Sequence, residues 1–146
     1  MYVAVYLILI QDNKVLLLQR ANTGFEDGNY SVPAGHVEID ESVTSALIRE
    51  VKEEVGIKIN KADIKFLNVN HRKSDRDKPY IDFFFTVSHW QGEIINCEPH
   101  KCDHLAWYNI DQLPENVISF VKHVILNIDN KDHTYHEYGF TSISSP

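Results

Sequence analysis

The sequence predicts an α/β protein, because strand-like and helix-like stretches alternate along the chain. Residues Tyr2 to Ile10 and Tyr80 to Trp90 are apolar and rich in β-branched and aromatic side chains, as buried strands are. Residues Ser42 to Val55 and Glu115 to Ile128 instead repeat apolar side chains at helical spacing. We expect the two helices to pack on opposite faces of one sheet.

Shorter strands complete the expected sheet. Gln11 to Lys14 is a polar turn, so Val15 to Gln19 should pair with the first strand as a hairpin. Residues Ile64 to Asn70 form another strand candidate, and a charged loop at His71 to Lys78 separates it from the strand that follows.

The chain is long enough to bury one sizeable core, since it has 146 residues of which 43% are hydrophobic. We expect a single domain over residues 1–146, with its core at about 3–128 and a polar tail at 129–146. The tail either covers a pocket, forms a dimer contact or is loosely ordered. The apolar N-terminal run lacks a basic segment and is too short to span a bilayer, so we interpret it as a buried strand.

The stretch from Gly35 to Ile57 is the part of the chain around which the rest is organised. Ser42 is a suitable helix N-cap, and Gly56 stands where a left-handed C-cap belongs. The apolar residues that would face the core recur every four positions, at Val43, Leu47, Val51 and Val55. This pattern predicts one helix with a buried face and an exposed face.

The last two turns of this helix crowd three carboxylates onto one side. Glu50, Glu53 and Glu54 are related by spacings of three and four residues, at which like charges repel. Arg49 can reach Glu53, but one guanidinium cannot neutralise three carboxylates. Because hard divalent cations take oxygen ligands, the cluster predicts a magnesium or manganese site; the alternative is an ordinary solvated helix face.

The spacing of these residues resembles the Nudix box at every specified position. Gly35 is followed after five residues by Glu41, and after seven more by the run Arg49-Glu50-Val51-x-Glu53-Glu54-x-Gly56-Ile57. The resemblance is closest over residues 35–57 and extends more loosely from about residue 3 to residue 128. It implies the Nudix fold, an α/β/α sandwich around a twisted mixed sheet. It also implies a MutT-like pyrophosphohydrolase that uses Mg²⁺, with Mn²⁺ as a substitute.

The resemblance implies roles for individual residues. The candidate metal ligands are the Gly35 backbone carbonyl and the carboxylates of Glu50, Glu53, Glu54 and Glu98. Either Glu53 or Glu54 is the best candidate for the general base that activates water. Arg49 would orient a catalytic glutamate, and Glu41 would brace Arg49 or hold a water on the metal.

Three residues are candidate contacts to the substrate. Arg20 ends its strand where the family often carries a phosphate-binding cation, although an ordinary strand-end cation would look the same. Tyr30 and Phe84 are aromatic side chains that could stack on a nucleobase, as could Trp107. Core packing is the commoner use of such side chains.

The sequence favours a nucleoside triphosphate, oxidised or otherwise modified, as the substrate. The run from Glu98 to Cys102, followed by Trp107, resembles relatives that release a monophosphate and pyrophosphate. Arg72 stands near the position of the proline typical of ADP-ribose hydrolases, and no tyrosine lies between His71 and Pro79 as in dinucleoside polyphosphate hydrolases. Two alternatives remain open. One is a Nudix hydrolase of another nucleoside-diphosphate derivative or an RNA 5′ end, and the other is a non-catalytic nucleotide sensor.

Charge and cysteine content limit the partners. The chain has 21 Asp and Glu against 14 Lys and Arg, a formal net charge of −7, which argues against a long nucleic acid. An acidic pocket repels a polyphosphate unless divalent cations bridge the two. We therefore expect a small nucleotide substrate, no membrane partner, and a homodimer as an open alternative. Two cysteines do not make a disulfide framework, so we expect reduced thiols and a cytoplasmic protein.

Overall fold

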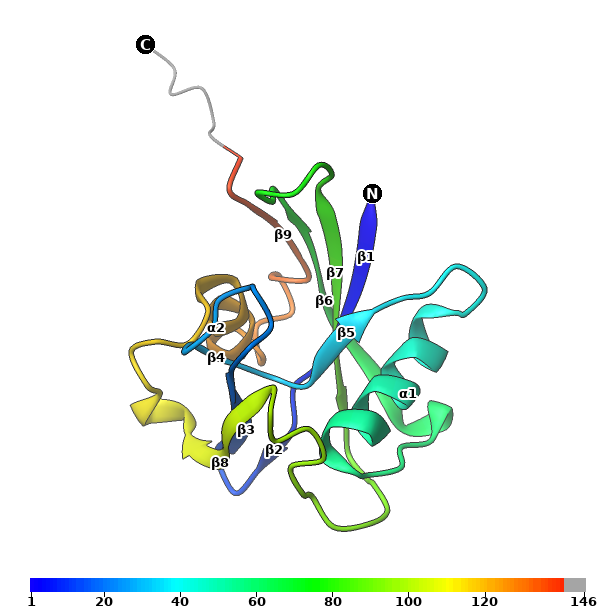
Figure 1. Cartoon of the computed structure of the whole chain (residues 1–146), viewed down its shortest axis with the longest axis vertical. Coiled ribbons are helices and arrows are strands. Elements are labelled where there is room, and N and C mark those ends of the chain that lie inside the picture. Colours follow the sequence, from blue (N-terminus) through cyan, green and yellow to red (C-terminus); the bar gives the residue numbers. More distant parts are fainter. Residues whose placement is uncertain (141–146) are drawn as a thin grey trace.

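The computed structural model describes residues 1–140 and contains a larger and a smaller sheet with two α-helices (Figure 1). The larger sheet has the strand order β5-β1-β7-β6-β9. Its strands are β1 (Tyr2–Leu7), β5 (Ala34–His36), β6 (Ile64–Arg72), β7 (Tyr80–Val87) and β9 (Tyr135–Tyr138). The sheet is mixed, because β1 runs parallel to β7 and β6 parallel to β9, whereas the β1-β5 and β6-β7 pairs are antiparallel.

The smaller sheet is built on a central antiparallel strand, β3. Its strands are β2 (Ile10–Gln11), β3 (Lys14–Arg20), β4 (Tyr30–Ser31) and β8 (Cys102–Asn109). Asp12 and Asn13 join β2 to β3 with φ values of 54° and 60°, as a tight hairpin turn requires. The expected hairpin is confirmed, but the expected single sheet is wrong in detail. The run from Tyr2 to Ile10 divides between two sheets, because β1 ends at Leu7 and β2 starts at Ile10.

The helices α1 (Val43–Val55) and α2 (Ser119–Leu126) lie on opposite sides of the larger sheet (Figure 1). Helix α1 follows Ser42, whose side chain accepts a hydrogen bond from the Ser45 amide. It ends at Gly56, which has a φ of 77° and donates its amide to the Lys52 carbonyl. The α/β class and both predicted caps are confirmed. Two 3₁₀ turns, Lys61–Asp63 and Ile110–Gln112, connect other elements.

The second helix is shorter than the sequence predicted. We expected helix from Glu115 to Ile128, but α2 begins at Ser119. The preceding residues pair with β4 instead, since the Tyr30 amide donates to the Asn116 carbonyl at 2.8 Å and the Ile118 amide to the Tyr30 carbonyl at 2.9 Å. Main-chain hydrogen bonds to a distant strand therefore replace the first turn of the expected helix.

Part of the polar tail belongs to the larger sheet. Strand β9 extends the sheet beyond β6, with Val69 opposite Tyr135 and Arg72 opposite Tyr138. The expected core at about 3–128 stopped short of this strand, which is only four residues long and polar. Residues 141–146, the rest of the expected tail, lie outside the described part of the chain.

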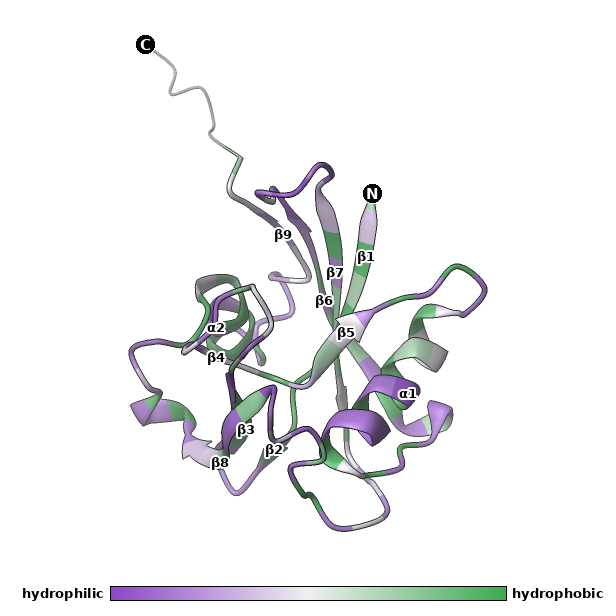
Figure 2. Ribbon diagram, in the orientation of Figure 1, coloured by the Kyte–Doolittle hydropathy of each residue, from purple (hydrophilic) through white to green (hydrophobic). Residues whose placement is uncertain are grey.

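Alternate side chains of β1 supply two separate cores. Ala4 and Tyr6 pack in the core that contains α2, whereas Val5 and Leu7 pack in the core that contains α1. Figure 2 shows hydrophobic residues along the inner strands and hydrophilic residues in the loop that joins β6 to β7. Within residues 1–140, no helix combines the length and hydrophobicity needed to cross a bilayer. The two cores hold α1 and the sheet in a fixed relation at the site described next.

We predict that Leu47→Ala lowers the free energy of unfolding by about 2–5 kcal/mol. The Leu47 side chain lies on the buried face of α1, and its truncation leaves a cavity. The matched control is Ile39→Ala, since Ile39 is 99% exposed and its truncation should change stability by less than about 0.5 kcal/mol. Urea denaturation of the two variants and the unmodified protein measures both effects. Equal stability of the two variants would contradict the packing of α1.

Candidate functional site

The site begins with the side of α1 that turns away from the core. Leu47, Val51 and Val55 bury one side of the helix. Glu50 and Glu54 are consequently turned toward the wall of a pocket, where they are partly buried, while Glu53 is exposed. The three carboxylates that the sequence singled out thus lie on the same part of the molecule.

Arg49 is the centre of an ion-pair network on α1. Its Nη2 and Nε donate to the two carboxylate oxygens of Glu41 at 2.5 and 3.0 Å. Its Nη1 donates to Glu50 at 2.8 Å and lies 3.5 Å from Glu53, and Nη2 also donates to the His36 carbonyl at 3.1 Å. The hydrogen bonds from Arg49 lower the pKa of Glu41 to about 2. The geometry therefore agrees with the expectation that Glu41 braces Arg49.

Gly35 lies directly against Glu50. A Cβ atom added to Gly35 would stand 2.1 Å from Cδ of Glu50 and 2.4 Å from its Oε1. Only glycine leaves room for a carboxylate that close to the backbone of β5. Strand β5 in turn is held by β1, where Val5 is opposite Gly35.

Glu54 is a carboxylate under electrostatic stress. It accepts a hydrogen bond from the Ala34 amide at 3.2 Å. Burial and the neighbouring Glu50 nevertheless raise the pKa of Glu54 well above its usual range, and Glu98 adds to the rise. Burial also raises the pKa of Glu50, against the opposing effect of Arg49. Since Glu98 lines the same pocket, the structure brings this loop residue toward the helix carboxylates, as the sequence predicted.

These residues fit a hard divalent cation by the chemistry of their donors. The group offers carboxylates and the Gly35 backbone, all of them oxygen ligands. A cation would also relieve the repulsion that raises the pKa of Glu54. In residues 1–140, no three His, Cys, Asp or Glu side chains are already gathered as a metal-binding group. The Glu50 carboxylate is instead held by a hydrogen bond from the Arg49 guanidinium.

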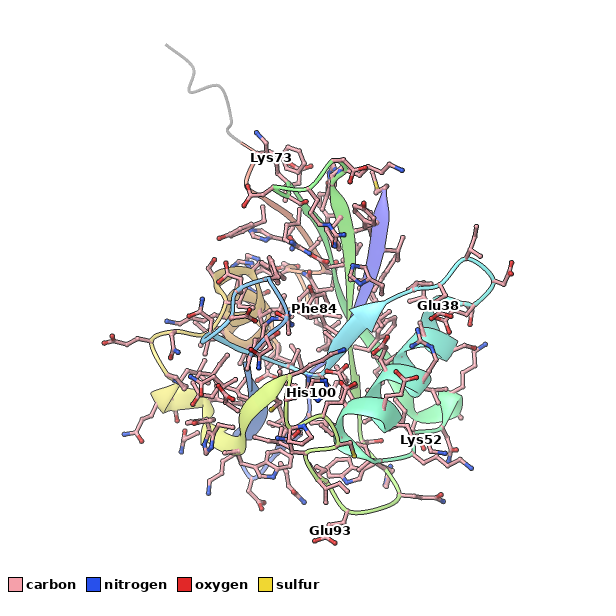
Figure 3. The ribbon with its side chains drawn as sticks, viewed as in Figure 1. Glu38, Lys52, Lys73, Phe84, Glu93 and His100 are labelled. Carbon is pink, nitrogen blue, oxygen red and sulfur yellow. The ribbon has the colours of Figure 1, made fainter. Side chains whose placement is uncertain are left out.

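The carboxylates open into a pocket of about 1170 Å³. Figure 3 labels two of its lining residues, Glu38 beside the start of α1 and Lys73 near the end of the long strands. The pocket therefore extends along the molecule from α1 to the turn after β6. Its basic lining residues are Arg20, Arg49, Arg72, Lys73, Arg76 and Lys101. Acidic residues line the pocket as well, namely Glu26, Glu38, Glu50, Glu53, Glu54, Asp75 and Glu98. An anionic substrate thus meets basic side chains beside a carboxylate cluster that itself needs a cation.

The structure supports one of the three predicted substrate contacts in part and contradicts the other two. Arg20 lines the pocket, but its guanidinium donates to the Phe25 carbonyl and to Thr23. The prediction for Phe84 is wrong, because this ring is fully buried in the middle of the molecule and stacks on Tyr6 at 4.5 Å (Figure 3). The prediction for Tyr30 is wrong as well.

The ring of Tyr30 packs edge-to-face on Tyr108 at 5.4 Å, and its hydroxyl accepts a hydrogen bond from the Tyr108 hydroxyl. It is not one of the described residues that line the pocket. Trp107, the other aromatic candidate, packs against the core that contains α1. None of the three aromatic side chains named from the sequence is therefore placed to stack on a base.

Sequence reasoning missed several residues that line the pocket. Phe25 and Arg72 face it from different segments, as do Tyr80 and Tyr138. His36 also lines it, and its Nε2 lies 2.9 Å from the Tyr80 hydroxyl. A charged loop after β6 was a signal for basic pocket residues, but nothing in the sequence pairs Phe25 with the end of β6.

Comparison with known proteins identifies the class that this fold and site define. A family model described as the NUDIX domain matches residues 1–127. The chain therefore belongs to the Nudix hydrolase family.

Particular relatives differ in what their names say they act on. The chain is 47% identical over 115 residues to an ADP-ribose pyrophosphatase of Methanocaldococcus jannaschii, which covers 77% of this chain and 64% of that protein. It is 32% identical over 111 residues to an NAD-capped RNA hydrolase NudC of Stutzerimonas stutzeri, which covers 74% of this chain and 37% of that protein. The chain thus spans less than two thirds of either relative.

Solved structures agree on the fold. A MutT NUDIX hydrolase from Burkholderia pseudomallei superposes with a TM-score of 0.79, at 23% identity, over 87% of this chain and 97% of that one. At this identity the likeness confirms the Nudix fold, the α/β/α arrangement around a mixed sheet that the sequence implied.

The raised pKa of Glu54 predicts how stability depends on pH. A carboxyl group whose pKa rises above its ordinary 4.5 on folding favours the protonated form. Below about pH 4.5 the group is protonated in both states and does not destabilise the folded protein. As the pH rises through the folded pKa, the carboxyl group ionises in its buried position and the free energy of unfolding falls. We expect Glu54→Gln to be more stable than the unmodified protein at pH 8 without divalent cations, and the difference to vanish at low pH.

Urea denaturation at several pH values measures this difference. Adding Mg²⁺ at pH 8 should stabilise the unmodified protein and leave Glu54→Gln nearly unchanged. The control is Glu93→Gln, because Glu93 is exposed in the loop after β7 (Figure 3). A Glu54→Gln protein that is less stable at pH 8 would show that the carboxylate is not under stress.

Proposed function

We propose that this protein hydrolyses the diphosphate linkage of a nucleotide with the help of a divalent cation. The observation that carries the proposal is the carboxylate cluster of α1, braced by Arg49 and pressed against Gly35 at the wall of a large pocket. Such a cluster serves no packing purpose and repels itself in the absence of a cation.

The residues of the cluster divide the work of the reaction. Glu50, Glu54, Glu98 and the Gly35 carbonyl would hold the cation, of which Mg²⁺ is the first candidate and Mn²⁺ the second. When bound, a divalent cation offsets the charge of the phosphate oxygens and lowers the pKa of the attacking water.

Glu53 is the carboxylate most free to act as the general base. It is exposed, and within residues 1–140 its one side-chain polar contact is with Arg49 at 3.5 Å. Water attacks one phosphorus atom, its proton passes to Glu53, and the bond to the bridging oxygen breaks. The electron pair of that bond leaves with the second phosphate, whose charge basic residues of the pocket such as Arg20 would stabilise.

The first candidate substrate is a nucleoside-diphosphate derivative of the ADP-ribose kind. The pocket of about 1170 Å³ is large enough for a nucleotide derivative, since typical small-ligand sites have ~300–1,000 Å³. The M. jannaschii relative, named an ADP-ribose pyrophosphatase, supports the same class. A nucleoside triphosphate, which the sequence favoured, is the second candidate, because Glu98 from the triphosphatase-like run lines the pocket.

A substrate panel with Mg²⁺ separates these candidates through their products. The panel contains ADP-ribose, canonical and oxidised nucleoside triphosphates, a dinucleoside polyphosphate and 5′-capped RNA. The first candidate predicts AMP and ribose 5-phosphate from ADP-ribose, at a kcat/KM above that for any triphosphate. Monophosphate and pyrophosphate as the preferred products would establish the second candidate. Tight nucleotide binding without hydrolysis of any substrate would contradict catalysis and indicate a sensor.

We predict that Glu53→Gln and Glu54→Gln each lower kcat by about 10²- to 10⁴-fold while the protein stays folded. The two variants should differ in cation dependence. Glu54→Gln should need more Mg²⁺ for half-maximal rate because it loses a ligand, whereas Glu53→Gln should not.

Lys52→Gln is the control for these variants, since Lys52 is an exposed residue of the same helix turn (Figure 3). It should keep nearly full activity. If both glutamate variants also kept full activity, the assignment of these carboxylates would be wrong.

A further inference from the structure

The loop between β3 and β4 carries an exposed aromatic ring that the proposed reaction does not use. Phe25 is 41% exposed and lines the pocket. Cζ of Arg20 lies 5.2 Å and Cζ of Arg72 lies 5.6 Å from the centre of its ring. These two guanidinium groups lie near the ring, and the part of its surface that stays exposed to the pocket is suited to stack on a planar group.

The loop holds this ring in place before any ligand binds. The Asp27 carboxylate accepts hydrogen bonds from the Thr23 amide at 3.1 Å and the Gly24 amide at 2.9 Å. Arg20 closes the loop from the other side, since its Nε donates to the Phe25 carbonyl at 2.8 Å. A rigid loop reduces the ordering cost of binding, so Phe25 is presented ready for contact.

Arg72, at the end of β6, is also fixed. It is only 5% exposed, and its Nε and Nη2 donate to the two oxygens of Asp82 at 2.7 and 3.1 Å. Asn70 donates to the same carboxylate at 3.2 Å. The rings of Tyr80 and Phe120 lie 4.2 and 4.4 Å from Cζ of Arg72. Aromatic rings thus pack closely around this guanidinium.

One edge of Arg72 remains available. Among the described residues, Nη1 has no hydrogen-bond acceptor, and Arg72 lines the pocket. Because Asp82 already neutralises the guanidinium and aromatic rings surround it, this corner favours a neutral planar group over a second phosphate. A guanidinium only donates hydrogen bonds, so the group must present acceptors on its edge.

We propose that Phe25 and Arg72 form a nucleobase subsite, in which Phe25 stacks on the base and Nη1 of Arg72 donates to acceptors on its edge. The proposal rests on the proposed function, since it assumes a nucleotide substrate. A purine offers N7 as an acceptor, and a 6-oxopurine adds O6, where adenine has a donor amine. The contribution of Arg72 is therefore larger for a 6-oxopurine than for adenine.

Binding of product-like ligands tests this subsite without turnover. AMP, IMP and ribose 5-phosphate are titrated into the cation-free protein and followed by NMR chemical shifts. Both nucleotides should bind at least tenfold more tightly than ribose 5-phosphate, which lacks a base. Phe25→Leu should weaken AMP and IMP about five- to a hundredfold and leave ribose 5-phosphate unchanged. Phe66→Leu is the control, since Phe66 is 51% exposed and lies outside the pocket.

Arg72→Lys separates recognition of the base from a structural role. Lysine keeps the charge beside Asp82 but loses the planar fork, so the affinity for IMP should fall several-fold more than that for AMP. A structural role alone would weaken all three ligands alike. Phe25→Leu lies in an exposed loop and decides the question if Arg72→Lys fails to fold.

Unchanged nucleotide binding in Phe25→Leu, or an equal loss for ribose 5-phosphate, would overturn the subsite. This outcome is distinguishable from failure of the proposed function. A protein that binds bases as described and hydrolyses no substrate would refute only the reaction. A protein that hydrolyses nucleotides with Phe25→Leu unimpaired would refute only the subsite.

Discussion

The guanidinium of Arg49 holds together carboxylates from two segments that would otherwise repel one another. It pairs with Glu41 in the loop before α1 and with Glu50 on α1, and it donates to the His36 carbonyl at the end of β5. Loop, helix and strand are thereby fixed at one point. Arg49 makes no hydrogen bond to Glu54 among the described residues, and burial together with the neighbouring Glu50 raises the pKa of Glu54. A divalent cation is the natural complement to that deficit.

The position of Glu50 depends equally on the absence of a side chain at Gly35 in β5. Glycine at position 35 lets a carboxylate lie where a Cβ would stand. The register of β1 with β5 and the burial of Leu47 and Val51 hold the two elements at that separation. Packing in the core under α1 and the geometry of the carboxylates are therefore parts of the same constraint, because a shift of α1 would move every ligand at once.

The sequence was informative where structure depends on neighbours along the chain. The caps of α1 and its carboxylate cluster follow from residues within about twenty positions, and the structure places them as expected. It was misleading where distant segments meet. Pairing of residues 116–118 with Tyr30 shortens α2, and β9 joins the edge of β6 from the tail.

The aromatic residues show the same limit. A run of three phenylalanines does not reveal which core each ring enters. Phe84 packs in the core that contains α2, whereas Phe85 packs in the core that contains α1. The buried pair of Arg72 with Asp82 joins β6 to β7 across a loop, and a lone aspartate in an apolar strand gives no sign of its partner. Phe25 lies in a loop that looks only polar and flexible in the sequence, yet Asp27 and Arg20 hold it in place.

The central claim is that the carboxylates of α1 and their neighbours form a cation site. Electron paramagnetic resonance of free Mn²⁺ titrated with the protein measures this most directly, because bound Mn²⁺ loses the signal of the hydrated ion. The account predicts that the unmodified protein depletes the free signal and that a folded variant with Glu50, Glu53 and Glu54 all changed to Gln does not. Equal depletion by both proteins would place the cation elsewhere and contradict the account.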